Sequence, residues 1–306
     1  MRGHLLPSFA CRGAFGAACL KVLPRFASAI KPTYGGSRVS ASENAFIQKQ
    51  STKDLFILRQ LVTKDFKLKY RRSVLGVVWS VLNPLLMMIV MSLVFSFFLR
   101  YGDIPHYPLY IIVGNITWMV FGDSTSAGVM SIIDAASLLK KVKVNKAVFP
   151  AERVLFCLVN FAFSLVAVFI VMVWEGVWPT LALALLPVCL FLLLLFCVGV
   201  SLFLSALAVF FRDVIHLWGV ILTALNYATP IFWPVAMIDS VPYHFVRVLM
   251  RANPMFNYIS FMRSLIIDGT APDPLVFGLC VFWAVFALVV GGLVFKKCQR
   301  KFILFI

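Results

Sequence analysis

The chain has 306 residues, of which 62% are hydrophobic and only 13% are charged, and its net charge is +16. Soluble domains average about 45–50% apolar and about 25% charged residues, so this composition excludes an ordinary secreted or cytosolic domain and indicates a polytopic membrane protein. The basic excess fits a nucleic-acid partner, anionic lipid or a topology signal. The positions of the charges along the chain distinguish these three.

Runs of about 20 mainly apolar residues are long enough to cross about 30 Å of hydrocarbon as a helix. Helix is the expected conformation because backbone polar groups in lipid must find partners within their own segment. Six such spans are predicted, at residues 74–99, 107–133, 154–174, 181–211, 214–233 and 275–295. The fold class expected is therefore an all-α polytopic membrane protein with a six-span transmembrane domain over residues 74–295.

The basic residues alternate between the two sides of these spans. The segment before the first span, the second and fourth connections and the tail at 296–306 together hold 24 of the 28 Lys and Arg residues. The positive-inside rule therefore places both termini in the cytoplasm. This distribution explains most of the net charge, and no surface typical of nucleic-acid binding is visible.

The chain begins with a segment that carries little information. Residues 1–50 are predicted to be a disordered cytoplasmic extension, or the result of a start codon assigned too early, because Arg12 and several glycines interrupt the apolar stretch that a signal peptide would need.

An amphipathic helix is predicted over residues 51–73. Ser51 and Asp54 stand at capping-box spacing, and apolar residues then recur on one face with basic residues on another. Such a helix lies along the cytoplasmic lipid surface. It is either a generic basic anchor or an element that contacts a partner and stands at the cytoplasmic mouth of a pore.

The second cytoplasmic connection, residues 134–153, has the pattern of a short helix. Asp134 is placed to cap it and Pro150 to begin the next helix. Leu138 and Leu139, followed by several lysines, predict a short amphipathic peg that docks in a partner's groove. The simpler interpretation is a loop that only obeys the positive-inside rule.

The last outer connection, residues 234–274, is long for a turn. Its apolar stretches are too short to span a membrane and are separated by Pro and Gly, which is typical of re-entrant outer helices that narrow an exit. Alternatively, these helices only cap the bundle.

Asp123 is the one acid predicted inside a span. An intramembrane charge is costly and suggests function, but residues 122–126 also read as a helix break at which Asp123 caps the second half. Asn83-Pro84 and Thr229-Pro230 are predicted to kink the first and fifth spans. Two kinked helices of this kind could form a gate.

Aromatic residues gather at the end of the fifth span. Tyr227, Phe232 and Trp233 are candidates for a glycan path, because aromatic faces stack on sugars, although an interfacial belt explains most membrane tryptophans. No phosphate-binding loop, HExxH, GxSxG or metal-ligand cluster occurs in the sequence. If the activity of the protein requires energy, a different chain must bind and consume the energy source.

Four stretches together carry a resemblance to a known family: KDFKLKYRRSVLGVVWSVLNPLL (64–86), KKVKVNKAVFPAERVL (140–155), PIFWP (230–234) and NPMFNYISFMRSLI (253–266). They resemble the membrane subunit of type-2 ATP-binding-cassette exporters, specifically the permeases for polysaccharide, O-antigen and teichoic acid. The resemblance covers residues 50 to 305. It departs at residues 1–50, which the family usually lacks, and at Lys143 and Asn145, where an aromatic residue and a proline are expected.

The resemblance implies a homodimer with two ATPase subunits that exports a lipid-linked polysaccharide across the cytoplasmic (inner) membrane. The chain itself would be a transport subunit without enzymatic activity or cofactor, with ATP and Mg²⁺ bound by the partner. The implied coupling residues are Leu138, Leu139, Lys140, Lys141, Val142, Lys143 and Lys146. The implied cytoplasmic gate and headgroup site contains Lys69, Tyr70, Arg71 and Arg72. The implied channel lining is Trp79, Asn83, Pro84, Tyr227, Phe232 and Trp233.

Two alternatives remain open. One is a type-2 permease for a drug or a small lipid. The other is a membrane enzyme that acts on a lipid-linked sugar. A passive channel is disfavoured because no filter-like loop is visible.

Overall fold

The computed structural model describes residues 41–70, 76, 78–97, 104–141 and 144–305. Over these residues the regular structure is entirely helical, which confirms the all-α prediction. The chain divides into two units, Met1–Gln60 and Leu61–Ile306. Of the first unit, the described part is a single helical stretch, residues 41–60, which forms the beginning of α2.

Helix α2 (Ala41–Tyr70) begins well before residue 51, where the sequence places its start. Ser51 and Asp54 therefore lie inside the helix and do not cap it, and residues 41–50 are helical rather than disordered. The reason is that nothing in residues 41–50 breaks a helix. The rest of the predicted extension and residues 71–73 lie outside the described residues.

The second unit holds the remaining helices. They are α3 (Val78–Phe97), α4 (Tyr107–Asp134), α5 (Ala136–Leu139), α6 (Val148–Trp174), η2 (Leu181–Leu185), α7 (Leu186–Phe210), α8 (Val214–Ala228), α9 (Met237–Ser240), α10 (His244–Ala252), α11 (Pro254–Arg263), η3 (Ser264–Asp268), α12 (Pro274–Cys298) and α13 (Phe302–Phe305).

Four segments among the described residues are both long enough and apolar enough to cross a membrane: Val78–Phe95, Val148–Trp174, Leu181–Phe210 and Pro274–Cys298. They correspond to the first, third, fourth and sixth predicted spans. The second, α4, has the length but carries several polar residues along it. The fifth, α8, has only 15 residues and ends early.

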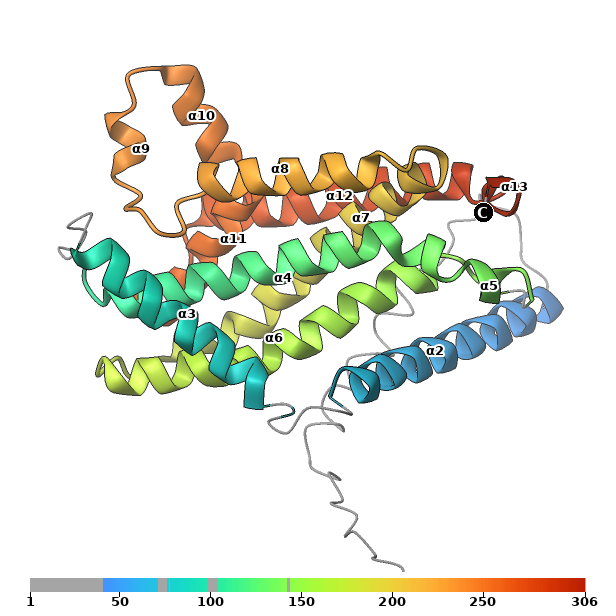
Figure 1. The fold of residues 1–306 in the computed structure, drawn as a ribbon, viewed down its shortest axis with the longest axis horizontal. Coiled ribbons are helices and arrows are strands. Elements are labelled where there is room, and N and C mark those ends of the chain that lie inside the picture. Colours follow the sequence, from blue (N-terminus) through green and yellow to red (C-terminus); the bar gives the residue numbers. More distant parts are fainter. Residues whose placement is uncertain (1–40, 71–75, 77, 98–103, 142–143, 306) are drawn as a thin grey trace, which may run out of the picture. The chain divides into compact units, whose positions relative to one another are not determined.

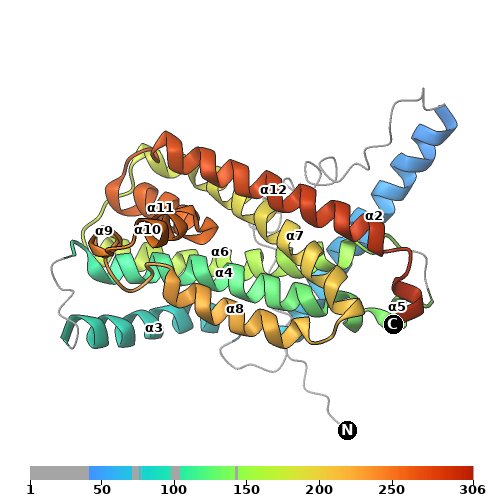
Figure 2. The ribbon, with the colours of Figure 1, turned by 90° about the horizontal axis from the view of Figure 1, so that it is seen from above.

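Helix α4 is the centre of the second unit. It contacts α3, α6, α7, α8 and α11, and Figures 1 and 2 show it running between them. In both views α5 and α13 lie at one end of this bundle, while α9, α10 and α11 lie at the other. These ends are called the α5 end and the α11 end.

Helices α7 and α12 lie side by side, as Figure 2 shows. Their backbones meet at two glycines, since a Cβ atom built at Gly291 would overlap the carbonyl oxygen of Gly199. Small residues allow such close packing of helices in membranes, where van der Waals contact replaces the hydrophobic effect as the driving force. A third glycine, Gly128 of α4, faces Ser201 of α7, whose Oγ would lie 2.5 Å from an added Cβ.

The two prolines predicted to kink a helix lie in different positions: one is inside a helix and the other follows the end of one. Helix α3 continues through Pro84, which lies inside it. Helix α8 ends at Ala228, so Thr229-Pro230 is a helix terminus and not a kink within the fifth span. The physical reason is that the residue before a proline is driven towards extended backbone, and Thr229 has φ −97° and ψ 133°. The non-helical residues 229–234 that follow are called the exit segment.

Candidate functional site

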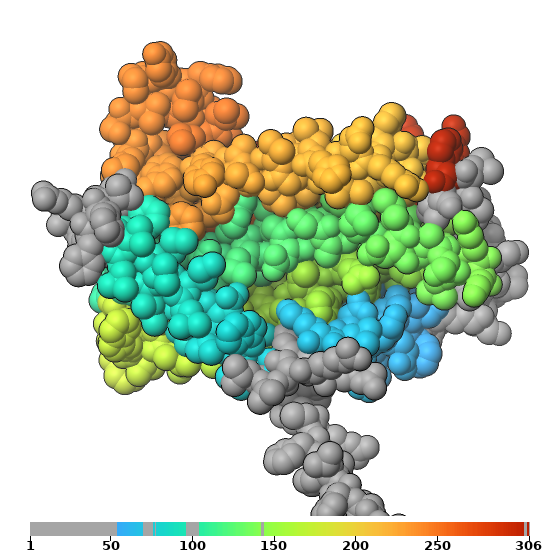
Figure 3. Space-filling view, viewed as in Figure 1, coloured from blue at the N-terminus to red at the C-terminus, as the bar shows by residue number. Residues whose placement is uncertain are grey.

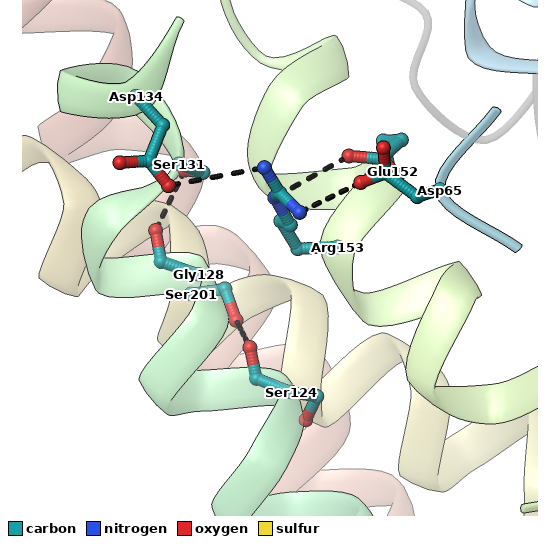
Figure 4. Close-up of polar contacts among 8 residues, drawn as sticks. All are labelled: Asp65, Ser124, Gly128, Ser131, Asp134, Glu152, Arg153 and Ser201. Atoms are coloured by element: carbon teal, nitrogen blue, oxygen red, sulfur yellow. Dashed lines mark hydrogen bonds and ion pairs between the residues drawn. The ribbon is translucent and has the colours of Figure 1, made fainter. Parts of the chain in front are cut away.

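A cluster of one arginine and three carboxyl side chains lies at the α5 end (Figure 4). The guanidinium of Arg153 on α6 is 2.7 Å from the carboxylate of Asp65 on α2, 3.6 Å from that of Glu152 and 3.8 Å from that of Asp134. This group is called the Arg153 cluster. It joins α2, the end of α4 and the beginning of α6 through one side chain.

Two aromatic contacts add to the junction between α2 and α6. The rings of Phe66 and Phe163 have centroids 5.8 Å apart. The ammonium of Lys69, a predicted gate residue, lies 5.6 Å from the ring centroid of Phe156. The side chain of Tyr70 and all of Arg71 and Arg72 lie outside the described residues.

The predicted coupling peg is a single helical turn, α5. Leu138 is 37% exposed and Leu139 only 9%, so only the first of the two leucines is available to a partner. Asp134 does not cap α5, because it is the last residue of α4 and its carboxylate turns towards Arg153. Lys140 and Lys141 are exposed, whereas Val142 and Lys143 lie outside the described residues.

Lys146 turns away from the peg towards the end of the chain. Its Nζ donates to the carbonyl oxygen of Gln299 at 2.5 Å and lies 5.5 Å from the ring centroid of Phe302. Partial burial lowers the pKa of the Lys146 ammonium. The coupling segment and the C-terminal residues are therefore in direct contact.

Helix α4 presents a polar stripe on its outer side. Asn115, Met119, Asp123, Ser126 and Met130 follow helical spacing there and are exposed or half-buried. Helix α4 contacts both α3 and α8, the helices that carry the implied channel lining. Figure 3 shows the surface of α4 below that of α8, with α3 below only one end of it.

The helix is unbroken at Asp123, so the predicted break at residues 122–126 is wrong. The polar side chains that suggested it are accommodated inside the helix: the hydroxyls of Ser124 and Thr125 donate back to the carbonyl oxygen of Phe121. Asp123 itself is exposed on the stripe.

Residues predicted to line a channel fall at both ends of the bundle. On α3, Trp79 is 50% exposed and Asn83 is half-buried, but Pro84 is buried and faces the bundle interior. Tyr227 is 75% exposed. Trp79 lies in the first turn of α3, whereas Phe232 stacks on Phe95 near the other end of that helix. The rise between residues 79 and 95 is about 24 Å, so the residues of the implied channel lining do not form one cluster.

The exit segment is fixed to α4 and α3 by aromatic side chains. The rings of Phe232 and Phe95 stack with centroids 5.3 Å apart. The hydroxyl of Tyr107 donates to the carbonyl oxygen of Phe232 at 2.8 Å, and that of Tyr110 to the carbonyl oxygen of Trp233 at 3.0 Å. Two backbone carbonyls of this non-helical segment thus accept hydrogen bonds from side chains of α4.

Arg263 of α11 is the buried centre of this arrangement. Its guanidinium donates to the carbonyl oxygens of Pro230 at 2.8 Å, Ile231 at 2.9 Å and Tyr110 at 3.2 Å. Its Cζ also lies 3.3 Å from the centroid of the Tyr110 ring. Sequence reasoning missed this residue, although an arginine in an otherwise apolar helix too short to span was a visible signal.

Comparison with known proteins identifies the family to which this chain belongs. The model of the family described as ABC-2 type transporter matches residues 57–267. The chain belongs to the ABC-2 type transporter family. It is accordingly an integral membrane protein and the transport subunit of an ATP-binding-cassette transporter, with ATP hydrolysis assigned to a partner ATPase. This confirms the resemblance seen in the sequence and excludes the membrane-enzyme alternative.

Curated relatives of this ABC-2 permease are known from two organisms. The chain is 34% identical over 218 residues to the O-antigen export system permease protein RfbA of Myxococcus xanthus, covering 71% of this chain and 82% of that protein. Two proteins of the same name from Klebsiella pneumoniae are 29% and 28% identical over 250 residues, covering 81% of this chain and 94% of each.

Proposed function

We propose that this ABC-2 permease moves a lipid-linked polysaccharide of the O-antigen class from the cytoplasm to the outer face of the cytoplasmic membrane. The observation that carries the proposal is the likeness to three permeases named for O-antigen export, over most of the length of both chains. These relatives favour a polymer over a drug or a small lipid as the substrate.

The proposed transporter contains two copies of this chain and two ATPase subunits. Large apolar side chains are exposed on α3 and α8, among them Leu93 and Val220. Helix α4, which contacts both of them, carries the stripe with Asn115, Asp123 and Ser126. A polar stripe is costly against lipid. If two copies face each other through this stripe, the polar side chains line a channel between them. Sugar hydroxyls then form the hydrogen bonds that water would otherwise make with these side chains.

In this arrangement α4 and α8 are the second and fifth of six spans, and both termini lie in the cytoplasm. The exposed apolar residues of α3 and α8 then face the second copy or lipid. The outer helices α9–α11 enter the outer leaflet and return, so that Phe232 and Trp233 stand at the exit. The positive-inside distribution of Lys and Arg supports this orientation.

The α5 end is the proposed cytoplasmic end, where the ATPase acts. Lys69, Arg71 and Arg72 stand at the entrance, since guanidinium groups suit a pyrophosphate-linked headgroup. ATP-driven closure of the ATPase pushes α5. The Arg153 cluster links α4 and α6 to α2, so it offers a direct route from the pushed segment to the entrance.

The test is a strain in which the gene for this chain is deleted and the genes for polymer synthesis are intact. We expect lipid-linked polymer to accumulate in the cytoplasm and to disappear from the surface, with both effects reversed by the wild-type chain. Normal surface polymer in the deletion strain would contradict the proposal. Loss of resistance to a drug, with no polymer retained, would identify the small-molecule alternative instead.

A further inference from the structure

The end of the chain folds back onto the coupling segment. This C-terminal tail, residues 296–305, consists of the last turn of α12, the residues after it and α13. Gln299 is the residue at which α12 ends, and its carbonyl oxygen accepts the hydrogen bond from Lys146. A cation at the carboxyl end of a helix is also favoured by the helix dipole, so the contact has two sources of stability.

The tail is a packed part of the bundle. Phe302 is fully buried, with its ring centroid 5.3 Å from that of Phe295 on α12 and 6.1 Å from that of Phe210 on α7. Phe305 also contacts the Phe210 ring, at 5.0 Å. Lys146 therefore fastens the coupling segment to the ends of α7 and α12 through an ordered anchor.

Basic residues are exposed on both of the fastened segments. On the coupling side, Leu138 is partly exposed beside the exposed Lys140 and Lys141. In the tail, the exposed basic residues include Lys297, Arg300 and Lys301, and the tail contains no acidic residue. Like charges brought together repel one another unless an acidic surface neutralises them.

We propose that α5 and the C-terminal tail form a single docking surface for an acidic face of the ATPase subunit, with Lys146 as the positioning residue that holds the two halves together. This inference rests on the proposed function, in which α5 receives the ATPase. It adds the tail as a second contact. The partner is recognised by charge complementarity around Leu138, since basic rim residues of this kind govern the rate and salt dependence of association.

The first experiment measures the affinity of the purified ATPase for the full-length permease in nanodiscs of zwitterionic lipid. We expect Lys297→Glu, Arg300→Glu and Lys301→Glu together to weaken binding about tenfold at low salt, and less at high salt because salt screens exposed charges. Arg251→Glu at the α11 end, where the side chain is 60% exposed, is the control for a charge reversal elsewhere on the surface and leaves the affinity unchanged.

The second experiment separates positioning by Lys146 from a general structural role. Lys146→Met keeps the bulk of the side chain but loses its charge and its donor, and we expect weaker ATPase binding with normal thermal stability. Lys146→Arg, which retains both, restores the affinity. Combining Lys146→Met with the triple charge reversal should weaken binding by less than the product of the two effects, since both act on one surface.

Each remaining outcome decides a separate point. Unchanged affinity after the triple reversal overturns the inference, and so does a triple reversal that weakens only the permease's retention of anionic lipid, because the tail then binds membrane. If Leu138→Asp abolishes docking while the triple reversal has no effect, the proposed coupling role of α5 stands and the tail proposal fails. If neither affects docking, the coupling assignment itself fails.

Discussion

The guanidinium of Arg153 lies 2.7 Å from the carboxylate of Asp65, so one ion pair joins α6 to the second half of α2. The pair is partly sheltered, with side-chain exposures of 31% and 17%. Glu152, beside it, is only 3% exposed and faces the same guanidinium. With Asp134, whose carboxylate is 3.8 Å away, three carboxyl groups therefore surround one guanidinium.

Replacing Arg153 tests this arrangement. We expect Arg153→Ala to lower the free energy of unfolding by about 2 kcal/mol, because the buried carboxylate of Glu152 loses its counter-ion. Thermal unfolding of the detergent-purified protein measures the loss. Arg212→Ala, at an exposed position, is the control and should be nearly neutral. Equal stability of the two variants would show that the cluster does not hold α2 in place.

The two leucines of α5 should respond differently to the same change. Leu138→Asp alters an exposed side chain, so we expect normal amounts of folded protein, weak ATPase docking and loss of export. Leu139→Asp buries a carboxylate and should lower the amount of folded protein. Membrane levels by immunoblot and ATPase co-purification separate the two effects. Normal export by Leu138→Asp would contradict the docking role of the peg.

Arg263 should be essential for the shape of the exit segment. Arg263→Ala leaves three backbone carbonyls without their donor, and we expect a loss of about 3 kcal/mol in the free energy of unfolding. Arg251→Ala serves as the control, because its pair with Asp239 is 60% exposed on both sides. A thermal midpoint for Arg263→Ala close to that of the control would show that the buried contacts contribute little.

A second substitution reaches the same site from α4. A Cβ at Gly114 would lie 2.7 Å from Nη2 of Arg263 and 3.3 Å from Cγ2 of Ile231, so Gly114→Ala should displace the guanidinium and destabilise the protein. Gly122→Ala on the same helix meets nothing within 4 Å and should be neutral or slightly stabilising. Comparison of the two thermal midpoints isolates the crowding at Arg263.

Neighbouring glycines of α12 offer an internal control for the packing of α7 against α12. Gly291→Ala would push a methyl group into the carbonyl of Gly199, and we expect a loss of about 2 kcal/mol or more. Gly292→Ala has open space within 4 Å and should change little. Thermal unfolding of both variants in one detergent gives the comparison. Similar midpoints would mean that the two helices separate easily at this point.

The sequence was sufficient to predict the membrane class, the helical fold, the family and the limits of most spans. Helices α6, α7 and α12 fall close to their predicted ranges, because the length of an apolar run is a local property. Shorter-range inferences about capping were weaker. Asp134 was predicted to cap a short helix, and a helix cap was one of two interpretations of Asp123. Instead Asp134 turns to Arg153 and Asp123 lies in an unbroken helix. A capping pattern does not reveal which competing partner is within reach.

The sequence alone determined the composition and the positions of the charges. These were enough to predict a membrane protein whose Lys and Arg residues gather on one side of its spans. Only the tertiary structure decided what individual charges do. Arg263 counted as one more positive charge in an outer connection, but it is buried among three carbonyl oxygens. Lys146 counted as part of a basic loop, but it holds the end of α12. The physical reason is that burial and partner distance arise from residues far apart in the chain, which meet only when the helices pack.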